Sequence, residues 1–119
     1  MRIDQLPKNP KEIILFVARH LLTQKEQSMC LGACAYRGSN GRTCAVGVLI
    51  PDELYSPEFE DKRVGEVLFM LGVETEHTDL LQRLQYIHDL PSKNHDRLLN
   101  LAREYNCISD IEKLIEELA

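Results

Sequence analysis

The segment from residue 30 to residue 55, CLGACAYRGSNGRTCAVGVLIPDELY, constrains the fold of this chain more than any other stretch. It contains three of the four cysteines and four of the six glycines in the 119-residue sequence. Short apolar runs of small residues flank RGSNGR, whose glycines and asparagine readily adopt the positive φ angles that a chain reversal needs. These features predict an antiparallel β-hairpin with a loop longer than the two-residue minimum.

The rest of the chain has the periodicity of amphipathic helices, with apolar residues recurring at spacings of three and four. The stretches with this pattern are residues 9–26, 61–72, 78–90, 94–106 and 109–118. We therefore predict an α+β fold in which a small antiparallel β-hairpin or sheet is packed by about five helices. The length suits a single domain spanning residues 1–119.

Several helix ends are also marked in the sequence. Asn9 followed by Pro10 is typical of a helix start, and Gly72 is typical of a helix end. Ser109 and Glu112 have the spacing of a capping box, which predicts that the last helix begins at Ser109.

The formal net charge of −5 and the pI of about 5.3 narrow the possible partners. Direct binding to nucleic acid is disfavoured, because it requires lysines and arginines gathered on one face. The acidic surplus suits solubility or docking on a basic protein partner. No apolar run approaches the roughly 20 residues that span a membrane, and the N-terminal residues lack the profile of a secretory signal. We therefore expect a cytoplasmic protein that is not membrane-bound and whose cysteines are reduced.

The cysteines also raise the question of a metal. Cys30, Cys34 and Cys44 together with His88 form a ligand set that zinc accepts. On a strand, however, Cys30 and Cys34 would be about 13 Å apart, too far for one ion to bridge. On a helix they would lie one turn apart and this objection would weaken. We expect no metal and no other cofactor.

A thiol enzyme is an alternative interpretation of the same region. Cys30, Cys34 or Cys44 could act as a nucleophile if His88 lay close to it, with Asp89 or Tyr36 assisting. Asp52 or Glu53 could also bond His88, which would be a structural network first and would make the neighbourhood of Cys44, His88 and Asp52 a site only if it opened to solvent. A small-ligand or nucleotide binder could use the same neighbourhood. Unpaired cysteines are nevertheless among the most buried residues, so the simpler prediction is that Cys44 packs in the core.

Two stretches, CAYRGSNGRTCAVGVLIPDELY and LQRLQYIHDL, resemble an uncharacterised group of small accessory proteins of tailed bacteriophages and prophages. The matching residues are Tyr36, Arg37, Gly38, Cys44, Ala45, Gly47, Leu49, Ile50, Pro51, Asp52, Glu53 and Tyr55 in the first stretch, and Leu84, Gln85, Ile87, His88 and Asp89 in the second. The resemblance covers roughly half of the chain. It implies a viral origin, and small phage accessory proteins often bind and inhibit proteins of the host.

We therefore expect a non-enzymatic protein that binds and inhibits a host protein, such as a factor of defence or of nucleic-acid processing. The predicted hairpin tip combines charge with glycine flexibility, as protein-binding loops on rigid scaffolds do. The candidate binding residues lie at this tip, just after the second predicted strand, and at the end of a helix: Arg37, Asn40, Arg42, Asp52, Glu53, Tyr55, His88 and Asp89.

Overall fold

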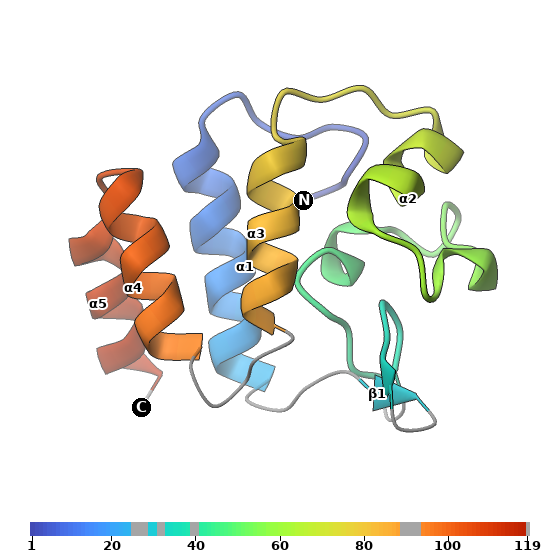
Figure 1. Ribbon diagram of the computed structural model, residues 1–119. Helices are drawn as coiled ribbons and strands as arrows, with labels where there is room; N and C mark the ends of the chain where they lie inside the picture. The colour runs from blue at the N-terminus through green and yellow to red at the C-terminus, as the bar shows by residue number, and fades with distance from the viewer. Residues whose placement is uncertain (25–28, 31–32, 39–40, 89–93, 119) are drawn as a thin grey trace.

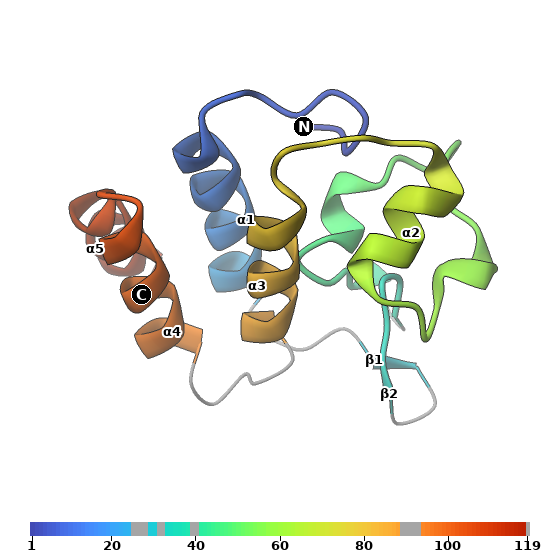
Figure 2. The same cartoon turned by 45° about the horizontal axis from the view of Figure 1, so that its top comes forward.

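The computed structural model describes residues 1–24, 29–30, 33–38, 41–88 and 94–118. The helices are α1 (Pro10–Gln24), α2 (Val64–Leu71), α3 (Thr78–His88), α4 (Asn94–Glu104) and α5 (Ile108–Glu117). Helices α1, α3, α4 and α5 lie side by side, and α2 lies on the other side of α3 together with the residues that precede it (Figures 1 and 2).

The predicted α+β fold is wrong, because the described residues form a helical fold. Strand pairing there is limited to the two-residue segments β1 (Met29–Cys30) and β2 (Ala33–Cys34), and to one isolated bridge between Arg37 and Thr43. The predicted second arm of the hairpin, residues 43–50, contains a turn and then the short 3-10 helix η2 (Gly47–Leu49).

The burial pattern explains why residues 43–50 do not form a strand. A strand with one solvent face buries alternate residues, whereas Cys44, Ala45, Val46 and Gly47 are all buried. Gly47 also lies directly against the preceding arm, because a Cβ atom built on it would be 2.0 Å from the carbonyl oxygen of Tyr36. The small residues of this segment therefore permit close packing of two irregular backbones rather than a regular ladder.

The chain reversal predicted between Arg37 and Arg42 is confirmed, although no regular strands flank it. The backbone N–H of Gly38 donates to the carbonyl of Arg42 at 2.9 Å. Gly41 has φ of 73°, the left-handed conformation that favours glycine. Asn40, which we predicted to lie at the hairpin tip, falls outside the described residues.

The predicted helix ends are correct in two of three places. The Asn9 side chain caps α1 by accepting a hydrogen bond from the backbone N–H of Lys11 at 3.0 Å. Gly72 ends α2 with φ of 69°. The capping box is wrong, because α5 begins at Ile108 with Cys107 as its N-cap and without a side-chain cap bond.

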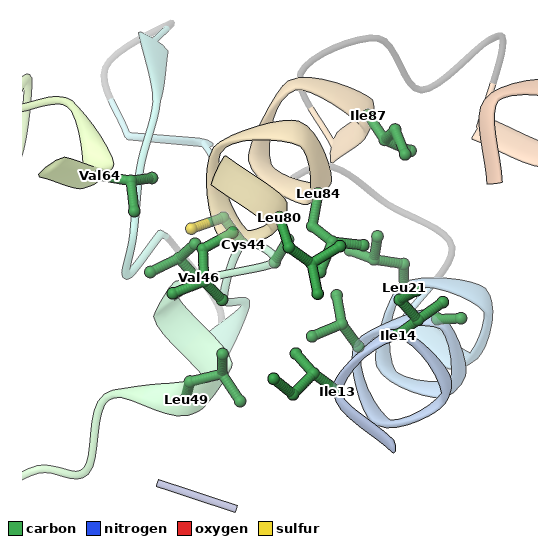
Figure 3. Close-up of a cluster of buried hydrophobic side chains, with 14 of the residues drawn as sticks. Ile13, Ile14, Leu21, Cys44, Val46, Leu49, Val64, Leu80, Leu84 and Ile87 are labelled. Atoms are coloured by element: carbon green, nitrogen blue, oxygen red, sulfur yellow. The ribbon is translucent and has the colours of Figure 1, made fainter. Parts of the chain in front are cut away.

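One hydrophobic core joins the helices to the irregular segment. Figure 3 shows Leu80 and Leu84 of α3 between α1 and the segment that carries Val46 and Leu49. All four side chains are almost completely buried. Within the described residues, no helix is both long enough and apolar enough to cross a membrane.

Candidate functional site

Arg37 brings together three parts of the region that sequence analysis singled out. Its guanidinium pairs with Asp52 (Nη1 to Oδ1, 2.7 Å), donates from Nη2 to the carbonyl of Ile50 at 2.9 Å, and lies 4.4 Å from the ring centroid of Tyr55. Arg37, Asp52 and Tyr55, all residues of the first sequence motif, are therefore neighbours in the structure. Because its guanidinium already has these partners, Arg37 stabilises the fold and is a poor choice as a contact residue for another protein.

Glu60 completes this cluster, and sequence analysis missed it. Its carboxylate accepts hydrogen bonds from the backbone N–H groups of Tyr36 (2.9 Å) and Arg37 (3.3 Å) and from the hydroxyl of Tyr55 (2.5 Å). In the sequence Glu60 is one of several acids in a loop, and such acids are usually solvated. No local spacing distinguishes it from Glu58, because its partners lie up to 24 residues away.

The two acids that follow the reversal have different partners. Asp52 has a side chain that is 95% exposed, and it contacts Arg37. Glu53 is also exposed and pairs with Arg2 at 3.3 Å. Arg2 also donates a hydrogen bond to Asp4, which lowers the pKa of that carboxyl. Glu53 therefore belongs to a charge cluster with Arg2 and Asp4 at the N-terminus, separate from the cluster around Arg37.

The predicted meeting of His88 with Asp52 or Glu53 stays a prediction. His88 is the last residue of α3, but its side chain, like Asp89, lies outside what the structure describes.

Cys44 is a packing residue, as predicted. It is 0% exposed, and its Sγ accepts a hydrogen bond from the backbone N–H of Gly47 at 3.1 Å. Cys107 is buried as well, and desolvation raises the pKa of its thiol. Neither sulfur is placed to attack a substrate from solution. Among the described residues, no group of three His, Cys, Asp or Glu side chains is arranged to hold a metal ion.

Two hollows meet at Arg42, on the surface formed by the chain reversal and α1. They have volumes of about 510 and 450 Å³ and share Gly41, Arg42 and Val48. We call this surface the Arg42 face and define it by the residues that line the hollows: Phe16, Arg19, His20, Thr23, Gln24, Arg37, Gly38, Gly41, Arg42, Thr43, Gly47, Val48, Ile50 and Asp52.

Side chains of α1 hold the chain reversal in place beneath this face. Gln24 accepts from the backbone N–H of Thr43 and donates to its carbonyl, both at 3.0 Å. The ring Nε2 of His20 lies 2.9 Å from the same carbonyl and 3.0 Å from the Thr43 hydroxyl. The base of the reversal is therefore fixed to a long helix, which positions the neighbouring Arg42.

Arginines outnumber carboxylates in the lining of the Arg42 face, on a chain whose net charge is negative. Its lining includes three arginines and a single carboxylate, that of Asp52. Phe16 adds an exposed aromatic side chain at the edge of the larger hollow. This combination of charge, aromatic surface and concave shape distinguishes the face from an ordinary solvated loop.

Comparisons with known proteins give no relative: no protein-family model, curated protein or solved structure matches this chain. The resemblance to phage accessory proteins therefore depends only on the two stretches quoted above.

Proposed function

We propose that this chain is a cytoplasmic accessory protein of phage origin that acts by binding a host protein through the Arg42 face. The observation that supports this best is the position of Arg42 between two hollows of about 510 and 450 Å³, with the exposed ring of Phe16 beside it. The phage origin rests on the sequence resemblance, and the cytoplasmic location on the sequence composition.

The residue types on this face are those that contribute most to protein interfaces. Arginine and aromatic side chains dominate the binding energy of many complexes, especially where they enter well-packed pockets. Arg42 follows a reversal that Gln24 and His20 hold against α1. A surface that is already ordered loses less conformational entropy on binding, which favours affinity.

The charge of the face also indicates what the partner surface is like. Arg37 pairs with Asp52 and Arg19 pairs with Glu117 at 3.6 Å, but arginine still outnumbers carboxylate in the lining. We infer that this excess favours a partner surface that carries Asp or Glu side chains. The net charge of the whole chain suggested a basic partner instead. We favour an acidic partner surface because the charges at the interface, rather than the net charge of the chain, contact the partner. The rest of the acidic surface would repel such a partner and so favour one orientation.

The proposal can be tested with the tagged chain as bait in a bacterial lysate and with the paired substitutions Arg42→Ala and Phe16→Ala. Phe16 is exposed, and Arg42 is half-buried in the wall of both hollows and outside the hydrophobic core. We therefore expect the double variant to keep its Tm within a few degrees and to lose at least about tenfold in affinity for the captured partner. Phe69→Ala is the matched control, because Phe69 is 87% exposed and lies on α2.

The two variants distinguish the possible outcomes. Loss of the partner with Arg42→Ala and Phe16→Ala, but not with Phe69→Ala, would support the Arg42 face. The reverse result would move the interface to α2 and contradict the proposed surface. If no purified candidate partner binds the chain with a measurable Kd, the protein-binding function itself fails.

A further inference from the structure

A second site lies around Tyr86 of α3, on residues separate from the Arg42 face. Tyr86 is 57% exposed and lines two further hollows, of about 470 and 350 Å³. The larger hollow lies between α3 and residues 61–64, which lead into α2. Helices α2 and α3 are neighbours in Figure 2. Its lining is Ala35, Tyr36, Asp61, Lys62, Arg63, Val64, Gln82, Gln85 and Tyr86.

Tyr86 has a cation near its ring and also lines the larger hollow. The guanidinium of Arg97 lies over it, 5.0 Å from the ring centroid. Arg97 lines the smaller hollow, whereas the lining of the larger one includes Tyr86 without Arg97. A planar group in the larger hollow could therefore stack on the exposed ring of Tyr86, which Arg97 helps to hold in place.

The larger hollow also provides charge and hydrogen-bonding groups. Lys62 and Arg63 outnumber the one carboxylate in its lining, that of Asp61. Gln82 and Gln85 supply side-chain amides, of which Gln85 already accepts a hydrogen bond from the backbone N–H of Val46 at 3.2 Å. Amides of this kind can bond the edge of a heterocycle, while cationic side chains bind phosphate.

We propose that this hollow binds a small planar anion of the nucleoside monophosphate class. The base stacks on Tyr86 and its phosphate lies against Lys62 and Arg63. The volume of about 470 Å³ is in the range usual for small-ligand sites. A longer polyanion is less favoured, because this cationic patch is small on a chain with a net charge of −5.

The test is a calorimetric titration of the full chain with adenosine monophosphate, and separately with adenosine and with inorganic phosphate. We expect saturable binding of one monophosphate per chain, and at least about tenfold weaker binding of either fragment, because each makes only half of the contacts. Tyr86→Leu, which removes the stacking ring, should weaken binding of the monophosphate by about tenfold or more. Tyr86→Phe, which keeps the ring, should bind like the wild type.

A charge-matched pair of double variants tests the phosphate contact. Lys62→Gln with Arg63→Gln should weaken the monophosphate at least about tenfold without changing the weak binding of adenosine. Lys113→Gln with Arg103→Gln removes the same charge from exposed positions on α5 and α4 and should leave binding unchanged. Absence of monophosphate binding, or equal binding by the wild type and Tyr86→Leu, would overturn the site. So would affinity for oligonucleotides that rises with their length, since that would indicate a single-strand surface. None of these results depends on whether the Arg42 face binds a protein.

Discussion

The helices α1, α3, α4 and α5 and the segment from residue 35 to residue 63 differ in how their backbone groups are satisfied. The helices bond their own N–H and C=O groups and pack through apolar faces. In the segment, side chains supply bonds that a ladder would otherwise make: Glu60 accepts from Tyr36 and Arg37, and Gln85 accepts from Val46. The conformation of the segment therefore depends on particular polar side chains, whereas the packing of the helices depends on apolar ones.

This difference predicts where substitutions are costly. In the helices, an exposed polar side chain can be replaced with little effect, because no backbone group depends on it. In the segment, removing one side chain can leave several buried N–H or C=O groups without partners, and each costs about 1–3 kcal/mol. The following substitutions test this contrast, from the largest expected effect to the smallest.

Gly47→Ala should have the largest effect. A Cβ atom at this position would be 2.0 Å from the Tyr36 carbonyl oxygen and 2.9 Å from its carbon, so one of the two backbones must move. We expect a loss of more than about 3 kcal/mol in the free energy of unfolding, measured by urea denaturation.

Gly65→Ala is the matched control in α2. There the added Cβ meets only the side-chain Nε2 of Gln82, at 3.5 Å, which is an ordinary contact. Alanine in a helix is favoured over glycine by about 0.5–1 kcal/mol, so this variant should be as stable as the wild type or more so. Equal effects of the two substitutions would contradict the close approach of residues 36 and 47.

Glu60→Ala should be the next most damaging change. It leaves two backbone N–H groups and the Tyr55 hydroxyl without their acceptor, which should cost about 2–3 kcal/mol in the free energy of unfolding. Glu58→Ala removes an exposed carboxylate two residues earlier and should change stability by less than about 0.5 kcal/mol. If the two variants unfold at the same urea concentration, Glu60 is a solvated loop acid and not a structural one.

Gln24→Ala tests the attachment of the reversal to α1. It removes both bonds to the Thr43 backbone but leaves His20 beside the carbonyl, so we expect a smaller loss of about 1–2 kcal/mol. The comparison in the helices is Glu104→Gln, which breaks the exposed pair between Arg83 and Glu104 at 2.6 Å and should cost at most about 1 kcal/mol. A larger loss for Glu104→Gln than for Gln24→Ala, by thermal denaturation of both, would reverse the contrast.

The same contrast explains how much of the fold could be predicted. Helical periodicity is local, so α1 and its apolar stripe of Ile14, Val17, Ala18 and Leu21 could be read directly from the sequence. The stretch TCAVGVLI has the composition of a strand but buries Cys44 through Gly47 without alternation. The close approach of the Tyr36 backbone to Gly47 depends on tertiary packing. It cannot be predicted from a local sequence pattern.

The candidate site was predictable to a similar, partial degree. The motif drew attention to Arg37, Asp52 and Tyr55, which do lie together, but it suggested an exposed arginine pair at a hairpin tip. Arg37 instead has bonds within the fold, so the proposed interface does not depend on it. The roles of Glu60 and Tyr86 could not be predicted, because the residues that they contact are distant from them in the sequence.

The smallest expected effect concerns a buried thiol in the helical part of the molecule, that of Cys107, the N-cap residue of α5. Desolvation and, to a lesser degree, the nearby carboxylate of Asp110 raise the pKa of this thiol in the folded protein. In the unfolded chain the thiol ionises near its ordinary pKa of about 8.5. Its contribution to stability is therefore fully present below about pH 8.5 and is lost as the pH rises through the folded pKa, because the unfolded state then releases the proton more readily.

Cys107→Ala removes this titration and should make the free energy of unfolding fall less steeply than in the wild type between about pH 8.5 and pH 10. Urea denaturation at several pH values, with a reductant present, measures the two slopes. The offset at neutral pH reports the lost packing of the sulfur, whereas the difference in slope reports ionisation alone. Parallel curves would mean that the folded protein stabilises the thiolate as well as water does, and they would contradict the burial of Cys107 between α4 and α5.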